Sequence, residues 1–273
     1  MIADPHIDPL IAARIEAELV AIEQTEGVRI LLAVESGSRA WRFPSCDSDY
    51  DVRFLYARPA TDYLTITPRR DVIERPVDAV FDVNGWDISK ALGLALRPNA
   101  ALLEWLCSPV CYRAAGQTPE RIRAFAVTAA NPLALAHHYA SLGRRSMEDI
   151  SAAGDAARLK TYCYASRAAL ALAWLRRHGS APPMDVPSLL AGLTVPEAVL
   201  PEITSLIARK REATEQDTTA KLPVLDTWLR AEMLAPIEIA DTRPAEDFGR
   251  RADALFKSIV CDTADASRGT SCC

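Results

Sequence analysis

Hydrophobic positions along the chain follow two patterns, and the change between them falls near residue 117. Before that point, short apolar runs that are typical of strands alternate with stretches in which apolar residues recur every three or four positions, as in amphipathic helices. Capping signals such as Asp8 followed by Pro9 support the helical stretches. We expect helices over residues 9–27, 88–96 and 100–108, and strands over 28–37, 51–59, 78–85 and 109–112.

Beyond Thr118 nearly the whole pattern is helical. We expect helices over 118–130, 131–150, 156–179, 199–215 and 245–260, with a proline-rich loop over 180–189. The pattern therefore predicts an α+β fold, with an α+β domain and its short mixed sheet over 1–116 and a helical bundle domain over 117–260. The polar tail, 261–273, is expected to be disordered.

The composition is that of an ordinary soluble globular protein, with 273 residues, 49% of them apolar, and a net charge of -5. The chain has no run of about 18 apolar residues, and its first residues do not form a signal peptide, so we expect a cytoplasmic protein that does not bind membranes. Seven cysteines without a CxxC pair and only four histidines disfavour a disulfide framework and a zinc site. The mild acidity disfavours tight, sequence-independent binding of duplex nucleic acid.

The most unusual stretch is GSRAWRFPSCDSDYDVRF, residues 37–54, in which aspartates alternate just before an apolar strand. Because side chains alternate along a strand, Asp49 and Asp51 point to the same side, with Cα atoms roughly 6.8 Å apart. Two unpaired carboxylates at this distance repel each other, whereas a hard divalent cation such as Mg2+ binds carboxylate oxygens. The alternative is an aspartate-rich turn that caps the strand and binds no ligand.

Two other interpretations of these aspartates can be tested on the sequence. A calcium-binding EF-hand loop that starts at Asp47 needs Gly at its sixth position and Glu at its twelfth, but the chain has Val52 and Arg58 there, so this interpretation fails. A sugar-nucleotide transferase can also use a metal-binding Asp-x-Asp motif. A larger nucleotide-binding domain normally precedes that motif, whereas only about 48 residues do so here, which leaves a weaker alternative.

Gly37 and Ser38, which follow the preceding apolar strand, add a second feature. A Gly-Ser pair at the start of a helical turn lets backbone N–H groups and the serine hydroxyl approach phosphate oxygens. A phosphate-binding turn and a carboxylate metal site on the next strand are the two parts that phosphoryl or nucleotidyl transfer needs. Together they favour such a reaction over a turn without a ligand.

With these motifs, the chain resembles the DNA polymerase beta nucleotidyltransferase superfamily, whose signature is an apolar strand, Gly-Ser or Gly-Gly, a short spacer and Asp-x-Asp or Asp-x-Glu. More narrowly, it resembles bacterial predicted nucleotidyltransferases associated with RNA ligase and RNA repair. This likeness covers residues 28–235 through the segments GSRAWRFPSCDSDYDVRFLY, GWDISKAL, NAALLEWLCSP, LKTYCYASRAALALAW and PPM. The chain departs from that family at Arg42, where the family usually has Gly. If this position needs a positive φ, Arg42 is strained or the loop differs.

The resemblance implies a polymerase-beta-type domain over 1–116 in which Gly37, Ser38 and Arg39 bind the nucleotide. It also implies a third carboxylate, on a later strand, that completes the metal site with Asp49 and Asp51. This third carboxylate would help to deprotonate the attacking hydroxyl.

Asp78, Asp82 and Asp87 are the candidates for the third carboxylate. Asp82 lies inside an apolar strand pattern, where a charge is costly unless it has a function. Asp87 has a simpler explanation as the N-cap of the next helix, and Asp78 can lie at the start of the strand. We therefore choose Asp82.

In the helical half, Lys160, Tyr164 and Arg167 fall at i, i+4 and i+7, on one face of one helix. A cation, an aromatic ring and a guanidinium in a row suit the phosphates and the base of a nucleotide. The alternative is a solvated helix face that carries one tyrosine. Lys210 and Arg211 are weaker candidates of the same kind.

These observations predict a nucleotidyltransferase that uses two Mg2+ or Mn2+ ions. It would transfer NMP from an NTP to an acceptor hydroxyl and release pyrophosphate. The acceptor is an RNA end, a protein side chain or a small molecule, among which the fold does not choose. The main alternative is a catalytically weak nucleotide-binding or partner-binding module on the same fold. The oligomeric state does not follow from the sequence.

Overall fold

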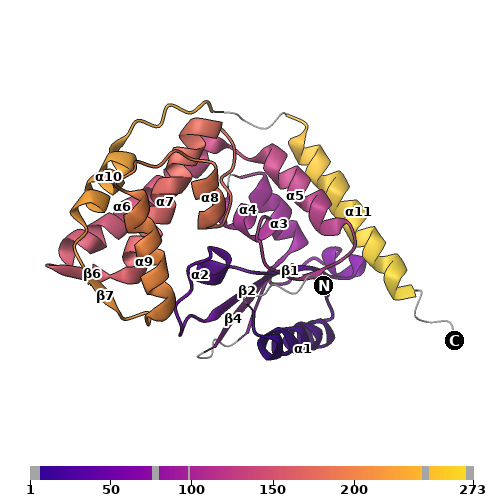
Figure 1. Ribbon diagram of the computed structural model, residues 1–273. Helices are drawn as coiled ribbons and strands as arrows, with labels where there is room; N and C mark the ends of the chain where they lie inside the picture. The colour runs from indigo at the N-terminus through magenta and orange to yellow at the C-terminus, as the bar shows by residue number, and fades with distance from the viewer. Residues whose placement is uncertain (1–6, 76–79, 98, 242–245, 269–273) are drawn as a thin grey trace. The chain divides into compact units, whose positions relative to one another are not determined.

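Contacts within the computed structural model divide the chain into two compact units (Figure 1). The described residues are 7–75, 80–97, 99–241 and 246–268. The sheet unit comprises Met1–Ser36, Tyr50–Ala129 and Pro244–Cys273. The helical unit comprises Gly37–Asp49 and Ala130–Arg243.

The sheet unit is built on a five-stranded mixed sheet in the order β3-β4-β2-β1-β5. Its strands are β1 (Arg29–Glu35), β2 (Tyr50–Ala57), β3 (Val72–Glu74), β4 (Phe81–Asp87) and β5 (Cys111–Ala114). The strands β2 and β4 run parallel, and the other neighbouring pairs are antiparallel. The parallel pair places the first residues of β2 and β4 side by side.

Helices pack around this sheet. They are α1 (Pro9–Glu26), α3 (Ile88–Ala95), α4 (Ala100–Leu106), α5 (Thr118–Ala129), α11 (Phe248–Arg268) and the 3-10 helix η1 (Ala60–Tyr63). The first of them shows how the sequence sets the ends: the Asp8 side chain accepts the Leu10 N–H, and Gly27 ends the helix at φ 62°. Its buried apolar face joins strand residues in one core, which stabilises the fold by about 1.5 to 3 kcal/mol for each fully buried Leu or Ile.

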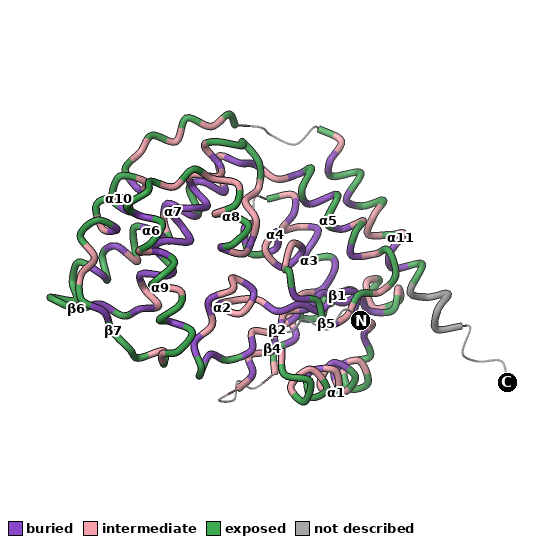
Figure 2. Tube along the Cα trace, viewed as in Figure 1, coloured by how far each residue is buried: buried purple, intermediate pink, exposed green. Residues whose placement is uncertain are grey.

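The helical unit is arranged around α7. Its elements are α2 (Gly37–Ala40), α6 (Pro132–Ala152), β6 (Ala156–Arg158), α7 (Leu159–His178), α8 (Val186–Ala191), α9 (Leu200–Glu212), β7 (Thr218–Ala220) and α10 (Pro223–Leu234). The helix α7 contacts α6, α8, α9 and α10, and β6 pairs with β7. Most of α7 is therefore buried, as its purple trace in Figure 2 shows.

The α+β fold class is confirmed, and so are two predicted helix caps: Asp87 accepts the Ser89 N–H and Asn99 accepts the Leu102 N–H. The elements β3, α8 and α10 were not predicted, because their apolar runs are short or interrupted by proline. The units also differ from the continuous division expected near residue 116. The helix α5 contacts α3, α4 and β1, and the helix α11 contacts α3 and α5, so both belong to the sheet unit. The latter helix continues to Arg268, into the tail that was expected to be disordered.

Candidate active site

Two carboxylates of the sheet unit face each other across the parallel strands β2 and β4. The register pairs Asp51 with Asp82, so each lies one residue inside the start of its strand. Both side chains are half-buried. The alternation of buried and exposed positions along each strand directs the two carboxylates to the same side of the sheet. We call Asp51 and Asp82 the carboxylate pair.

Arg53 joins the two members of the carboxylate pair. Its Nη2 lies 2.7 Å from Oδ1 of Asp51 and 2.6 Å from Oδ2 of Asp82, and its Nη1 donates to the Asp82 carbonyl at 2.8 Å. Arg53 was not among the predicted site residues. Its position two residues after Asp51 was the available signal, because that spacing places both side chains on the same face of the strand.

A buried glutamate fixes the backbone of Asp51. Glu35, the last residue of β1, is fully buried, and its Oε1 accepts the Asp51 N–H at 3.0 Å. Its other oxygen accepts the hydroxyl hydrogen of Tyr112. A buried carboxylate needs such donors, so Glu35 both satisfies its own charge and holds the start of β2 in place. The sequence analysis did not select Glu35 either.

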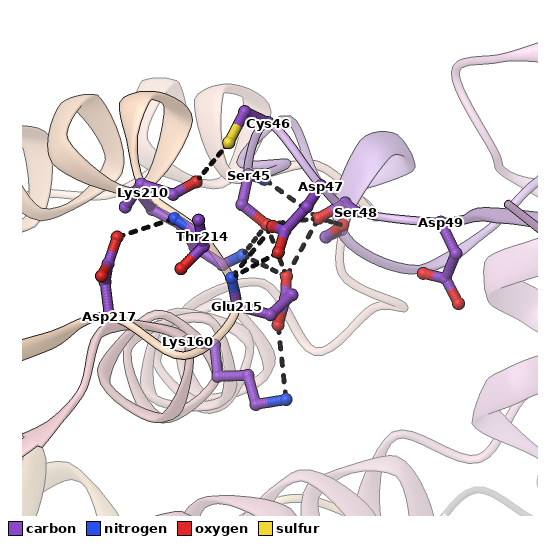
Figure 3. Close-up of polar contacts among 12 residues, drawn as sticks. Ser45, Cys46, Asp47, Ser48, Asp49, Lys160, Lys210, Thr214, Glu215 and Asp217 are labelled. Carbon is purple, nitrogen blue, oxygen red and sulfur yellow. Dashed lines mark hydrogen bonds and ion pairs between the residues drawn. The ribbon is translucent and has the colours of Figure 1, made fainter. Parts of the chain in front are cut away.

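The other candidate carboxylates, Asp49, Asp87 and Asp78, do not belong to the carboxylate pair. Asp49 immediately precedes β2, and its exposed carboxylate lies outside the serine and lysine contacts that Figure 3 draws. Asp87 is buried as the cap of α3, where it also accepts the Tyr63 hydroxyl at 3.0 Å. This agrees with the expected capping role of Asp87. Asp78 lies outside the described residues.

The chemistry of the carboxylate pair fits a divalent cation, because both oxygens already converge on one cationic nitrogen, that of Arg53. Among the described residues, no group of three or more His, Cys, Asp and Glu side chains is close enough to hold a metal ion. A metal bound to Asp51 and Asp82 would therefore compete with the guanidinium for the same oxygens. Asp49 is the further carboxylate that the sequence supplies next to β2.

The predicted phosphate-binding turn belongs to the helical unit, in a segment that we call the Gly-Ser loop, residues 37–49. Gly37 has φ 58°, a left-handed conformation that favours glycine. Arg39 closes the loop on itself, since its Nη2 and Nε donate to the carbonyls of Ser48 at 2.6 Å and Asp49 at 3.0 Å. Arg39 thus acts on the loop's own backbone.

The Ser38 hydroxyl connects to a cluster of polar side chains, of which Figure 3 labels Ser45, Ser48, Lys210 and Glu215. It donates to Ser48 Oγ at 3.2 Å, and both Ser48 and Ser45 donate to Oε1 of Glu215, at 3.0 and 2.6 Å. Lys210 donates to the same oxygen at 2.8 Å, although its side chain is only 1% exposed. We call Ser45, Ser48, Lys210 and Glu215 the serine–lysine cluster.

Glu215 is held in its ionised form. Burial raises the pKa of this carboxyl, but the hydrogen bonds from Lys210 and Ser45 and the charge of Lys210 outweigh burial and lower the pKa to about 2. The second carboxylate oxygen of Glu215 lies 3.3 Å from the ammonium group of Lys160. Glu215 therefore links the Gly-Ser loop to a helix residue that the sequence analysis selected for nucleotide binding.

The three predicted residues of α7 do not share one environment. Lys160 is about one third exposed and Tyr164 is 40% exposed, whereas Arg167 is only 4% exposed. The Arg167 guanidinium stacks on the ring of Trp41 at 4.4 Å and donates to the Met184 carbonyl at 3.1 Å. The Arg167 side chain is thus buried against Trp41 of the Gly-Ser loop, and its contact with nucleotide phosphates stays a prediction.

Tyr164 also contacts the Gly-Ser loop, with its ring edge-on to Trp41 at a centroid distance of 5.2 Å. The two weaker candidates of α9 do so as well. Lys210 contacts Ser45 Oγ at 3.3 Å, and Arg211 donates to the Arg42 carbonyl at 3.0 Å. Aromatic packing and these cationic contacts together define the position of the loop within the helical unit.

Comparison with known proteins identifies the family of the chain. A family model described as the RNA repair pathway DNA polymerase beta family, RlaP, matches residues 11–258. The chain belongs to the RlaP family. The uncharacterized protein YcgL of Bacillus subtilis (strain 168) is 41% identical over 233 residues, which cover 85% of this chain and 89% of that protein. The predicted resemblance to the polymerase beta superfamily and to RNA repair proteins is confirmed.

The departure of this RlaP chain at Arg42 has a structural counterpart. Arg42 has φ 70°, the left-handed conformation that glycine adopts without steric cost. The loop therefore keeps the backbone conformation that suits the usual Gly, and Arg42 is strained by roughly 1 to 2 kcal/mol. We expected either that Arg42 is strained or that the loop differs, and the structure shows a strained Arg42.

Among the helices that the structure describes, none combines the length and the apolar content needed to cross a membrane.

Proposed function

We propose that the chain transfers NMP from an NTP to an acceptor hydroxyl in a reaction that depends on Mg2+ or Mn2+. The observation that carries this proposal is the parallel register that brings Asp51 and Asp82 to one cation. Membership of a polymerase beta family supports the reaction type. The Gly-Ser loop and Lys160 supply groups that suit a triphosphate.

Different residues of the chain would bind the metal ions and the nucleotide. Asp51 and Asp82, with Asp49, would hold the divalent cations, which when bound neutralise phosphate charge and lower the pKa of an acceptor hydroxyl. The Ser38 hydroxyl and Lys160 would bind the triphosphate oxygens. The acceptor oxygen would attack the α phosphorus while the bond to the β phosphate breaks and pyrophosphate leaves. Asp82 would accept the proton of the acceptor hydroxyl.

Roles for two of the predicted nucleotide-binding residues follow from their surroundings. Tyr164 is exposed enough to stack on a base. Arg39 would act by holding the loop closed, because both of its described hydrogen bonds end on loop carbonyls.

An RNA end is the acceptor that we favour, because the family is described by an RNA repair pathway. A protein side chain or a small molecule would use the same carboxylates. The family match gives no support to the sugar-nucleotide transferase alternative.

One observation favours a second function, nucleotide binding without transfer. Arg53 occupies the position between the carboxylates that a metal would take, and a guanidinium neutralises them without activating a hydroxyl. In that case the chain would bind NTP and leave it intact.

Incubation with labelled substrates separates the two functions. The purified protein is mixed with each α-labelled NTP, Mg2+ or Mn2+, and total cellular RNA or protein. We expect transfer of label and release of pyrophosphate with the unchanged chain and neither with Asp51→Asn. Binding of NTP without either product would reject transfer and support the second function.

A further inference from the structure

The serine–lysine cluster contains one carboxylate that is surrounded by donors (Figure 3). Oε1 of Glu215 accepts from Ser45, Ser48 and Lys210, and its other oxygen pairs with Lys160. All of these residues belong to the helical unit. The cluster adjoins Ser38, the hydroxyl that the proposed function assigns to the triphosphate.

The hydroxyl hydrogens of the cluster can be counted. The hydrogens of Ser45 and Ser48 both point to Oε1 of Glu215, so neither serine donates to the other across their 2.7 Å contact. Ser48 Oγ then accepts the Ser45 N–H at 3.0 Å and, at the longer distance of 3.2 Å, the Ser38 hydroxyl. If the Ser38 hydrogen turns to a ligand, Ser48 Oγ still accepts the Ser45 N–H. The Ser38 hydrogen can therefore reach a phosphate oxygen without leaving a buried donor unpaired.

The two lysines that pair with Glu215 differ in exposure. Lys210 is only 1% exposed and lies 2.8 Å from Oε1, so it neutralises the carboxylate permanently. Lys160 is about one third exposed and lies 3.3 Å from the other oxygen. If Lys160 moves to a phosphate oxygen, Glu215 keeps Lys210 and both serines. Lys160 can thus be exchanged at low cost.

We propose that Glu215 is a positioning residue for the nucleotide triphosphate. It holds Ser45 and Ser48 so that the Ser38 hydroxyl is available to a phosphate oxygen, and it holds the Lys160 ammonium group at its other carboxylate oxygen until the nucleotide arrives. This inference rests on the proposed function, because it needs a triphosphate as the ligand. It adds a residue from the turn after α9 to the site.

The test is the change in affinity on neutralising Glu215. A nearby negative charge repels a triphosphate, so simple electrostatics predicts that Glu215→Gln binds NTP more tightly. Positioning predicts the opposite: affinity for a non-hydrolysable ATP analogue falls about tenfold or more, because Ser38 and Lys160 lose their placement. Adenosine, which has no phosphates, should bind the variant and the unchanged chain alike. Titration calorimetry measures the affinity of both ligands for both proteins.

Matched variants make the result specific. Glu212→Gln removes the same charge from an exposed position three residues earlier and should leave the affinity unchanged or slightly higher. Ser48→Ala keeps Glu215 and Lys210 but removes the link to Ser38, so it should weaken analogue binding in the same direction. If Glu215→Gln does not fold, Ser48→Ala tests the same proposal. In turnover assays, both weakened variants should raise KM for NTP more than they lower kcat.

The outcomes separate the two proposals. Failure of the unchanged chain to bind the analogue would reject the proposed function, and this inference with it. Normal binding by the unchanged chain with equal or tighter binding by Glu215→Gln and Ser48→Ala would overturn the inference alone. Equal losses for the analogue and adenosine would also overturn it, because a general structural defect does not depend on the phosphates.

Discussion

The carboxylate pair of the sheet unit and the serine–lysine cluster of the helical unit both pair carboxylates with cations, but in opposite ratios. In the ion pairs of the first, two carboxylates share one guanidinium, whereas in the second the one carboxylate pairs with Lys210 and with Lys160, which lies next to the cluster. The ion pairs of the first therefore have one excess negative charge, and those of the second, with Lys160 counted, have one excess positive charge. A metal cation suits the first and a phosphate anion suits the second.

The two regions also differ in how exchangeable their cations are. Arg53 is partly exposed between two strands, and Lys160 is partly exposed on a helix, but Lys210 is buried. A partly exposed cation can move away from its carboxylate when a ligand binds. A buried cation stays in its ion pair and stabilises the fold around it. Mutations that change one region and leave the other intact test this comparison.

The largest effect is expected at the carboxylate pair. Asp51→Asn and Asp82→Asn should each lower NTP turnover at least about a hundredfold, because each removes a charged metal donor worth several kcal/mol to the transition state. Pyrophosphate release measures the rate. Asp49→Asn should behave similarly if Asp49 completes the site.

Two controls accompany this prediction. Asp253→Asn, at an exposed position of α11, should retain full turnover. Asp87→Asn should affect stability more than the rate, since Asp87 caps α3. A rate near normal in Asp51→Asn or Asp82→Asn, or a stronger effect at Asp87 than at Asp82, would show that the carboxylate pair is not the metal site.

The second effect concerns pH and separates the helical unit from the sheet unit. The Glu215 pKa is about 2 in the folded protein, below its ordinary value of 4.5, so the stabilising contribution is fully present above pH 4.5 and is lost as pH falls toward 2. Because a quarter of the side chain is exposed, solvent screens part of the effect, and we expect about 2 kcal/mol. Glu215→Gln should lack this contribution.

Urea unfolding between pH 7 and pH 3 measures it. The difference in unfolding free energy between the unchanged chain and Glu215→Gln should shrink as pH falls, since both share every other carboxylate. Glu212→Gln, which removes the same charge from an exposed position, is the matched control. A constant difference for Glu215→Gln would mean that its pKa is not lowered.

The third effect tests whether Arg53 and a divalent cation compete. Arg53→Met leaves Asp51 and Asp82 without their shared guanidinium, so the protein should lose about 1 to 2 kcal/mol of stability in EDTA. Added Mg2+ should restore more stability to the variant than to the unchanged chain, because the variant binds the metal without displacing a cation. Thermal unfolding with and without Mg2+ measures both.

Arg75→Met is the matched control, because Arg75 pairs with Glu18 elsewhere in the sheet unit. Its loss should not change the effect of Mg2+. If Mg2+ stabilises Arg53→Met no more than the unchanged chain, Arg53 and the metal do not share a site, and nucleotide binding without transfer becomes the better function.

The comparison also shows what could be predicted from the sequence. The strands, their aspartates and the cap at Asp87 follow from local periods and local hydrogen bonds, and each of these is visible in a few consecutive residues. The pairing of Asp51 with Asp82 depends on strand register, which a sequence suggests only through its apolar pattern. Asp82 stood out because a charged residue interrupts an apolar strand, and the register pairs it with Asp51, while its role as a metal ligand stays a prediction.

Other features could not be read locally. Glu215 reaches Ser45 across 170 positions of sequence, and nothing in its own neighbourhood marks it. The spacing of Lys160 and Arg167 predicts that they lie on the same face of the helix. Which residues of that face stay exposed depends on how the other elements pack around α7. Non-local packing therefore determined what the sequence analysis missed.

The smallest effect is expected at Arg42, and it tests whether loop strain affects the helical unit alone. Arg42→Gly should relieve the strain of the left-handed backbone, partly offset by the greater freedom of glycine in the unfolded chain, for a net gain of about 0.5 to 1 kcal/mol. Arg42→Ala removes the same side chain beyond Cβ but keeps the strain, so it should not share the gain. Thermal unfolding compares the two variants. Equal stability of Arg42→Gly and Arg42→Ala would mean that the loop relaxes around a residue with a Cβ atom. A gain in Arg42→Gly without any change in the Mg2+ response would place the strain in the Gly-Ser loop and leave the carboxylate pair independent of it.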